Sequence, residues 1–280
     1  MGEISEHITD SFLNAFASDD VTHALSWFFT PEPLFMAGGT DRFSQFGAGH
    51  LLMVATCLVV ALLLARRYQH LPWGLENGSP RRRQLLWMAC IALGLLAIRD
   101  AFMATRGLME PVFWPLHICN FCEYLMLAYA LYPHGKVGLR LGDLLFCWAF
   151  PGSIGALLFP GWRYCPLLSF ASLGGFAEHT LLLAFALCML SGNGYRPNWR
   201  RFWLPAIIAA AGGIAFRIIN PMWNTNFFFV TNPESSGPPF VWAESIFGDP
   251  GYLVFYLMAA IAIWLAAYEI WNLFDRHRST

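Results

Sequence analysis

The chain has 280 residues, of which 57% are hydrophobic and only 12% are charged, and its formal net charge is −1. Soluble domains usually carry about a quarter charged residues, so this composition excludes an ordinary soluble protein and predicts a membrane protein. The near-zero charge also lacks the basic excess that binds nucleic acid, and we expect no nucleic-acid partner.

Residues 1–45 precede the first long apolar run and are predicted to form an extracytoplasmic N-terminal segment. A cleavable signal peptide begins with a positively charged region. The stretch 1–20 has no such region, so we expect that it is not a signal peptide. It carries instead the acidic residues Glu3, Glu6, Asp10, Asp19 and Asp20.

Apolar runs long enough to cross a bilayer follow through most of the remaining chain. A hydrocarbon core about 30 Å thick needs roughly 20 residues of α-helix. We therefore predict an all-α polytopic transmembrane helix bundle of seven spans over residues 46–273, followed by a cytoplasmic tail at 274–280. The predicted spans are 46–66, 85–106, 113–132, 142–158, 167–190, 202–219 and 251–273.

Basic residues fall on alternate connections between these runs. Short cytoplasmic loops retain an excess of Lys and Arg. One set of connections holds Arg42, Arg106 and Arg163, whereas the other set and the tail hold twelve basic residues. We therefore predict a plasma-membrane protein with its N-terminus outside and its C-terminus inside. The twelve are Arg66, Arg67, Arg81, Arg82, Arg83, Lys136, Arg140, Arg196, Arg200, Arg201, Arg276 and Arg278.

The connection over residues 220–250 is too long for a simple turn and contains no Lys or Arg. Structureless loops longer than about 12–15 residues are usually functional or disordered. This one is rich in Phe and Trp, a composition suited to the membrane interface or to the mouth of the bundle. We expect it to be ordered.

Ionisable residues inside membrane spans are costly and usually face the bundle interior, so each is a functional candidate. At 1.5 Å per residue, those at the outer ends of the spans lie within roughly 10 Å of the outer boundary. His179 is expected to lie somewhat deeper, and Glu123 and Asp143 are expected too far inward to join. The resulting outer polar layer comprises His50, Arg99, Asp100, His117, Cys119, Asn120 and Arg217.

Each member of this layer also has a structural interpretation. Arg99 and Asp100 can form an ion pair at a helix end that reaches the interface, and Arg217 can do the same. A lone membrane histidine is more often a hydrogen bond between helices than a catalyst.

The densest cluster of reactive side chains is His117-Ile118-Cys119-Asn120-Phe121-Cys122. On a helix, His117 and Cys119 point about 200° apart, so a base for the Cys119 thiol has to come from another helix. His179 is the obvious supplier, and Asn120 or Arg99 suits stabilisation of an oxyanion.

Two other chemistries fit the same residues. The spacing of Cys119 and Cys122 also fits a thiol-disulfide couple. His50, His117 and His179 together also suit Zn²⁺. We assign no cofactor and no metal, and the sequence fixes no oligomeric state.

Several segments resemble the YwaF-like family of bacterial integral membrane proteins, whose role is unknown. They are residues 46–52 (FGAGHLL), 114–120 (WPLHICN), 178–179 (EH), 194–197 (GYRP), 224–228 (NTNFF) and 248–251 (GDPG). That family is distantly similar to transmembrane protein 164, an acyltransferase of ether phospholipids. The resemblance implies Cys119 as nucleophile and His179 as base.

Three functions therefore follow, in order of preference. The first is a membrane-embedded lipid acyl hydrolase or acyltransferase that uses Cys119 and His179 on a phospholipid or fatty-acyl ester, with membrane lipids as its substrates. The second is a non-catalytic protein that binds or transports a lipid or small molecule. The third is a membrane thiol-disulfide redox protein.

Overall fold

The computed structural model describes residues 27–36, 43–191, 195–233 and 238–278, and every regular element within them is helical. The expectation about a signal peptide in residues 1–20 lies outside these ranges. The α-helices are α3 (Glu32–Met36), α4 (Ala48–His70), α5 (Pro80–Ala104), α6 (Ile118–Leu131), α7 (Gly135–Leu158), α8 (Phe170–Ser191), α9 (Trp203–Trp223) and α10 (Pro238–Arg278). Three 3-10 helices accompany them: η1 (Pro111–Phe113), η2 (Trp199–Arg201) and η3 (Phe227–Phe229).

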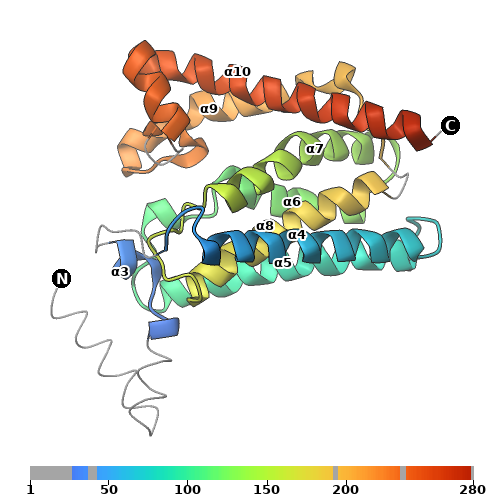
Figure 1. Ribbon diagram of the computed structural model, residues 1–280, viewed down its shortest axis with the longest axis horizontal. Helices are drawn as coiled ribbons and strands as arrows, with labels where there is room; N and C mark the ends of the chain where they lie inside the picture. Colours follow the sequence, from blue (N-terminus) through green and yellow to red (C-terminus); the bar gives the residue numbers. More distant parts are fainter. Residues whose placement is uncertain (1–26, 37–42, 192–194, 234–237, 279–280) are drawn as a thin grey trace, which may run out of the picture.

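The long helices run roughly side by side around α8, which packs against α4, α5, α6 and α7 (Figure 1). α4 and α5 form one side of the bundle, and α9 and α10 lie on the other side, next to α7. Because successive helices alternate in direction, the bundle has two distinct ends. We call them the Cys119 end, where α6 begins, and the Asp143 end, where α7 begins.

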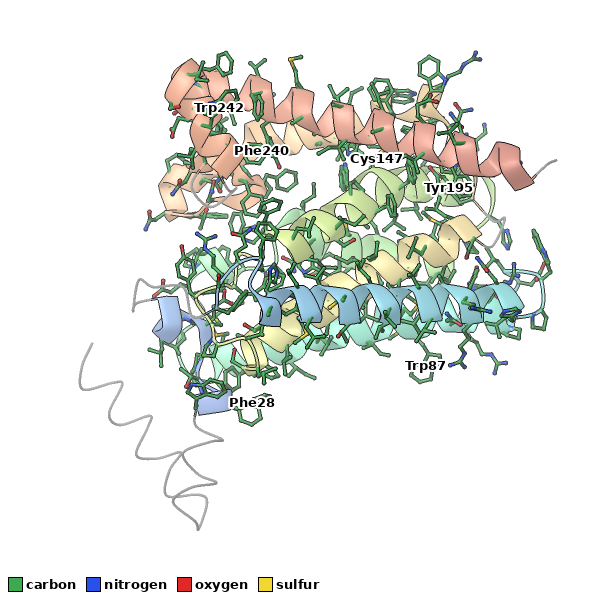
Figure 2. The ribbon with its side chains drawn as sticks, in the orientation of Figure 1. Phe28, Trp87, Cys147, Tyr195, Phe240 and Trp242 are labelled. Carbon is green, nitrogen blue, oxygen red and sulfur yellow. The ribbon has the colours of Figure 1, made fainter. Side chains whose placement is uncertain are left out.

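Large apolar side chains cover the outside of the bundle. Leu52 is 70% exposed, Trp87 is 68% exposed and Met222 is 75% exposed, and Figure 2 shows Trp87 pointing away from the other helices. A soluble monomer rarely exposes so continuous an apolar surface. The surface therefore suits contact with lipid, in agreement with the composition.

Six helical segments in the described residues are long and apolar enough to cross a membrane, whereas the sequence predicts seven spans. They are Ala48–His70, Pro80–Ala104, Gly135–Leu158, Phe170–Ser191, Trp199–Trp223 and Phe240–Leu273.

The difference is the predicted span 113–132, where α6 has only 14 residues and measures about 21 Å. Pro115 disfavours helical geometry in the residue before it, and His117, the residue before α6, is extended. The seventh span stays a prediction.

The boundaries of two other helices also differ from the prediction. α7 begins at Gly135 rather than at 142, so the fourth helix has 24 residues and is not short. Lys136 and Arg140, which the prediction places in a loop, belong to the first turns of α7. A helix end tolerates them because their long side chains can reach water from there. α5 begins at Pro80 rather than at 85 because Ser79 caps it by accepting a hydrogen bond from the Arg82 amide.

Two arginines at the start of α5 satisfy the carbonyl groups at the ends of two neighbouring helices. Arg81 donates to the carbonyl oxygens of Gln69 and Leu71, each at 3.1 Å, at the end of α4. Arg82 donates to the carbonyl oxygens of Ala130 and Leu131, at 2.8 and 2.7 Å, at the end of α6. The last carbonyls of a helix have no partner within it, so these basic residues join α5 to α4 and α6.

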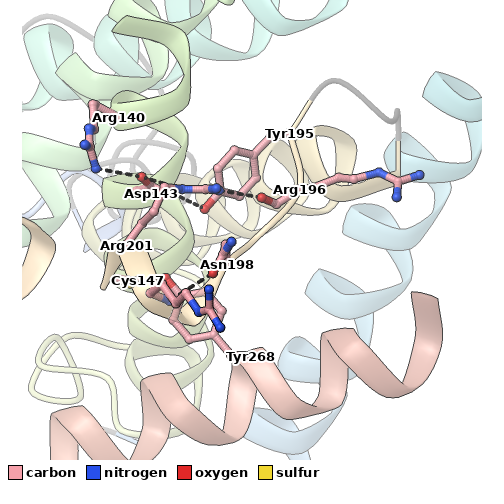
Figure 3. A network of polar contacts seen from close by, with 9 residues as sticks. Arg140, Asp143, Cys147, Tyr195, Arg196, Asn198, Arg201 and Tyr268 are labelled. Atoms are coloured by element: carbon pink, nitrogen blue, oxygen red, sulfur yellow. Dashed lines mark hydrogen bonds and ion pairs between the residues drawn. The ribbon is translucent and has the colours of Figure 1, made fainter. Parts of the chain in front are cut away.

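The longest polar network of the Asp143 end is centred on Asp143, which is fully buried (Figure 3). Its carboxylate accepts a hydrogen bond from Tyr195 Oη at 2.8 Å and from Arg201 Nε at 2.9 Å. Burial and the adjoining carboxylate raise the pKa of Tyr195 well above its ordinary value, so its hydroxyl remains the donor. The network holds the linker between α8 and α9 against α7.

Gly142 allows this network to form. A Cβ atom at Gly142 would lie 2.4 Å from a ring carbon of Tyr195, so only glycine leaves room for the ring. One turn further along α7, Cys147 Sγ lies 3.5 Å from Tyr268 Oη of α10. Figure 2 shows Cys147 and Tyr195 where α7 faces α10.

The segment 220–250 is ordered in its described residues, as expected from the sequence. Asn220, fully buried in α9, accepts from the Phe227 amide at 3.0 Å and donates to the Phe227 carbonyl oxygen at 3.0 Å. After η3, the first part of α10 folds back on the rest of that helix at Gly248. Phe240 and Trp242 of this part contact Phe255, with ring centroids about 6 Å apart (Figure 2).

Replacing Arg82 by alanine is expected to lower stability by about 1.5–3 kcal/mol, the usual contribution of hydrogen bonds to a charged group. The loss would be measured as a lower thermal unfolding temperature of the purified protein in detergent. Arg83→Ala is the matched control, because the Arg83 side chain is exposed and makes no hydrogen bond or ion pair with a described residue. Equal shifts for both variants would show that Arg82 does not stabilise the end of α6.

Candidate functional site

Arg99, near the end of α5, is the positive charge at the centre of a polar cluster. Its Nε and Nη2 atoms donate hydrogen bonds of 3.0 and 2.8 Å to Asp100 Oδ1. Nη2 also lies 3.5 Å from the Phe113 carbonyl oxygen. The Arg99 and Asp100 side chains are 30% and 23% exposed, so the ion pair is partly buried.

Carboxyl groups from three other helices surround this arginine. Glu178 of α8 is 6% exposed and interacts electrostatically with Arg99. Glu32 of α3 also interacts with Arg99, and Glu123 of α6 interacts with Arg99 and Glu178. We call Glu32, Arg99, Asp100, Glu123 and Glu178 the Arg99 cluster. Four carboxyls face one guanidinium, so the cluster has excess negative charge when all are ionised.

Glu32 is the member of the cluster that lies outside the membrane-spanning helices. Burial raises the pKa of its carboxyl above the ordinary value, and the positive charge of Arg99 opposes that rise. The charge balance of the cluster thus depends on protons as well as on the arginine.

Several polar atoms in the first turns of α6 are buried without a hydrogen bond to any described residue. They are Asn120 Nδ2, both carboxyl oxygens of Glu123, and His117 Nδ1, on the residue just before the helix. Glu123 is fully buried and Asn120 is 2% exposed. A buried polar atom without a partner costs about 1–3 kcal/mol. Because these atoms lie close together in the chain, the start of α6 is the candidate site.

Cys119 lies in the first turn of α6, among these residues. Its thiol is partly buried and interacts electrostatically with Glu123, Glu178 and Arg99. Cys122 is buried one turn further along, and both thiols are free. The structure thus brings together Arg99, Asp100 and Cys119 of the predicted polar layer.

His179, the predicted base, lies on α8 beside Trp162. Its ring centroid is 5.1 Å from that of the indole, and its Nδ1 lies 2.8 Å from the Gly175 carbonyl oxygen. Nδ1 is therefore the donor, which leaves Nε2 as the acceptor nitrogen. No hydrogen bond joins His179 to Cys119 in the described part of the chain, so their catalytic pairing stays a prediction.

His50 and His117 occupy separate environments. His50 Nδ1 accepts from the Phe46 amide at 3.0 Å, and Nε2 donates to the Leu157 carbonyl oxygen at 2.9 Å, which joins α4 to the end of α7. His117 instead packs against Phe227 and Phe229, with ring centroids 5.0 and 5.5 Å away. His50 thus has the structural role that a lone membrane histidine usually has.

Arg217 of α9 binds residues of the segment that follows this helix. It donates to the Val230 carbonyl oxygen at 2.9 Å and forms an ion pair with Asp249, at the bend in α10. Gly212, on the same helix, leaves room for the Phe228 ring, which a Cβ atom would approach to 2.8 Å. Arg217 therefore holds η3 and the bend of α10 together.

The structure bears differently on the zinc site and on the thiol-disulfide couple, the two other chemistries that the sequence allows. Within the described ranges, no group of three or more His, Cys, Asp or Glu side chains is placed to hold a metal ion. The three histidines of the zinc alternative accordingly contact different partners. The thiol-disulfide alternative keeps both of its cysteines on one face of α6, because Cys119 and Cys122 are three residues apart.

A cavity of about 210 Å³ lies at the opposite end of the bundle from Cys119. It is lined by residues of α4, α7, α8 and α10 and is open on one side, and Gln69 and Ser191 are polar residues in an otherwise largely apolar lining. Sites for drug-sized ligands usually measure about 300–1,000 Å³. The cavity therefore suits part of an acyl chain rather than a whole lipid, and it is not where the polar cluster lies.

The sequence matches the TMEM164 family over residues 42–268. The chain belongs to the TMEM164 family. No curated protein matches the chain in a comparison of sequences, and no solved structure matches it. The matched range begins before α4 and ends within α10, so it includes Cys119, His179 and the transmembrane part of the Arg99 cluster.

In this TMEM164 family member, Glu123 interacts electrostatically with Arg99 and Glu178, although the sequence predicts that it lies too far inward to join the polar layer. α6 begins at Ile118 rather than at 113, so Glu123 lies about 8 Å along the helix. Its four-residue spacing from Cys119 places both side chains on one helix face.

Replacing Arg99 by glutamine is expected to lower the free energy of unfolding by about 1.5–3 kcal/mol. This loss of stability is expected to grow as pH rises. Without the arginine, nothing opposes the rise that burial causes in the pKa of the Glu32 carboxyl, so the folded state binds its proton more tightly than the unfolded state does. Stability is then retained at acid pH and lost as Glu32 ionises. Unfolding temperatures at about pH 5 and about pH 8 measure the effect.

Arg99→Lys is the matched control, because it keeps the positive charge. It is expected to recover most of the loss at the higher pH. A deficit in Arg99→Gln that is the same at both pH values would show that the arginine does not neutralise the carboxyls.

Proposed function

We propose that the chain is a membrane-embedded lipid acyltransferase or acyl hydrolase whose nucleophile is Cys119. The supporting observation is the position of this partly buried thiol in an apolar bundle, beside the Arg99 cluster and the unpartnered amide of Asn120. A phospholipid or fatty-acyl ester, entering sideways from the outer leaflet, is the proposed substrate. Membership of the TMEM164 family is consistent with such a reaction.

The proposed reaction begins with transfer of the Cys119 thiol proton to His179 Nε2. The thiolate attacks the ester carbonyl carbon, and the bond from that carbon to the alcohol oxygen breaks, which leaves an acyl group on Cys119. Asn120 Nδ2 and the Arg99 guanidinium stabilise the negative charge on the carbonyl oxygen. The first alcohol leaves with a proton taken from an acidic side chain. A second alcohol or water then attacks the thioester and gives its proton to that side chain, and the sulfur recovers its own proton from His179.

The separation of Cys119 from His179 matters for this step. His179 keeps Nε2 as an acceptor because its Nδ1 is engaged by Gly175. Catalytic hydrogen bonds are often long in a protein without substrate and shorten when substrate binds. We therefore retain His179 as the proton acceptor.

A second candidate is a protein that binds or transports a lipid without catalysis. The apolar cavity at the Asp143 end favours it, because an acyl chain can enter a space of this size and lining without any chemistry. Under this alternative, lipid movement into vesicles survives Cys119→Ala but fails in Arg99→Ala.

The proposed membrane arrangement has seven crossings in the plasma membrane, with the N-terminus outside and the C-terminus in the cytoplasm. α6, together with residues 114–117 before it, would supply the seventh crossing. Twelve basic residues on the connections and tail at the Asp143 end support a cytoplasmic location for that end.

Cys119→Ala is expected to lower turnover of a lipid ester at least about 10³-fold, because it removes the nucleophile. It should also abolish labelling of the purified protein by an activated fatty-acyl thioester. Cys90→Ala is the matched control, since Cys90 is an exposed thiol on α5. Equal labelling of the parent protein and Cys119→Ala would exclude the acyl mechanism, whereas a reversible Cys119–Cys122 bond seen by mass spectrometry would favour redox chemistry.

Reporter fusions in a bacterial host test the seventh crossing. A phosphatase that is active only outside the cytoplasm is expected to be active when joined after Gly107 and inactive when joined after His134. A fluorescent reporter that folds only in the cytoplasm is expected to show the reverse. The same reporters joined after Thr280 should place the C-terminus inside. Equal phosphatase activity after Gly107 and after His134 would mean that α6 does not cross the membrane.

A further inference from the structure

Glu123 is a buried carboxyl to which the proposed reaction gives no role. Its side chain has no exposed surface, and neither carboxyl oxygen makes a well-formed hydrogen bond, although the Asn120 side chain lies close enough to interact with it. An ionised carboxyl in such surroundings costs far more than a neutral one, because nothing replaces its water. Its environment therefore favours a carboxylic acid, which is able to give up a proton.

The position of Glu123 on α6 directs it toward the chemistry. It follows Cys119 by four residues, so the two side chains share a helix face with their Cβ atoms about 5–6 Å apart. The thiol and the carboxyl also interact electrostatically. A carbonyl carbon bound to Cys119 Sγ would therefore place its ester oxygen within reach of Glu123.

The neighbours of Glu123 help it hold a proton. Glu178 of α8 is a second buried carboxyl that interacts with it, and two adjacent carboxyls disfavour joint ionisation. The opposing charge comes from Arg99, which already forms an ion pair with Asp100. One guanidinium does not neutralise every carboxyl of the cluster, so a proton remains on the Glu123 and Glu178 pair.

We infer that Glu123 is the catalytic acid that protonates the departing alcohol, and that the nearby charge of Glu178 helps Glu123 to keep its proton. This inference rests on the proposed acyl chemistry at Cys119. As the carbon–oxygen bond of the ester breaks, the oxygen takes the electron pair of that bond and the proton of the Glu123 carboxyl. The resulting carboxylate then accepts a proton from the second alcohol, or from water, as it attacks the thioester.

Two esters with the same acyl chain and different leaving groups separate this role from a structural one. An alkyl alcohol leaves as a strong base and needs a proton, whereas 4-nitrophenol leaves as a stable anion and does not. With the full chain in lipid nanodiscs, Glu123→Gln is expected to slow acylation by the alkyl ester about 10²–10⁴-fold, the usual contribution of general acid catalysis. Acylation by the 4-nitrophenyl ester should change only slightly.

Control variants keep the test decisive. Glu123→Asp, which retains an acid, is expected to recover part of the rate with the alkyl ester. Glu110→Gln removes an exposed carboxyl outside the Arg99 cluster and should leave both rates unchanged. The elution volume from a size-exclusion column and the unfolding temperature, both measured in detergent, show whether Glu123→Gln is folded.

The two proposals fail in different ways. If Glu123→Gln slows both esters equally or neither, while the parent protein still acylates Cys119, then Glu123 is not the acid and the acyl chemistry stands. If the parent protein does not acylate Cys119 with either ester, the proposed function itself is wrong. Selective loss of the alkyl reaction, with partial recovery in Glu123→Asp, supports the inference.

Discussion

Polar groups inside this bundle have to find their partners within the protein, and much of the structure follows from that constraint. Hydrocarbon offers no hydrogen bonds, so an unpaired group costs several kcal/mol. Arg82 meets the constraint by binding the end carbonyls of α6, and Asp143 meets it through Tyr195 and Arg201. Asn220 does the same for the segment after α9. These contacts join helices whose apolar surfaces alone would pack with little specificity.

Some buried polar atoms depart from this rule. Single atoms of Gln84, Arg140, Trp148, Trp162 and Tyr252 lack a hydrogen bond to a described residue. At the start of α6, Glu123, Asn120 and His117 keep such atoms within seven residues of one another. Unpaired polar atoms beside a thiol and an arginine suit a ligand that supplies the missing contacts, and an ester carbonyl and its alcohol oxygen offer both acceptors and a site for a proton.

The two ends of the bundle thus have different characters. The Asp143 end is basic, extensively hydrogen-bonded and adjacent to an apolar cavity. The Cys119 end is acidic, with four carboxyls around Arg99, and it is covered on one side by η3 and the bend of α10 through Arg217 and Asp249. Such a division suits a protein that is anchored at one membrane face and reacts with lipid at the other.

The sequence alone determined the helical membrane class and the positions of most spans, and it singled out Cys119, Arg99 and Asp100 as candidates for a polar layer. Those features depend on hydrophobic length and on the rarity of charge in membrane spans, both of which are local properties. Only the tertiary structure decided that α6 starts at Ile118 and that Glu123 joins the Arg99 cluster. It also decided that both ring nitrogens of His50 form hydrogen bonds with backbone groups. The physical reason is that an extended segment before a helix changes the depth of every residue after it, and that the partner of a buried polar group usually lies on another helix.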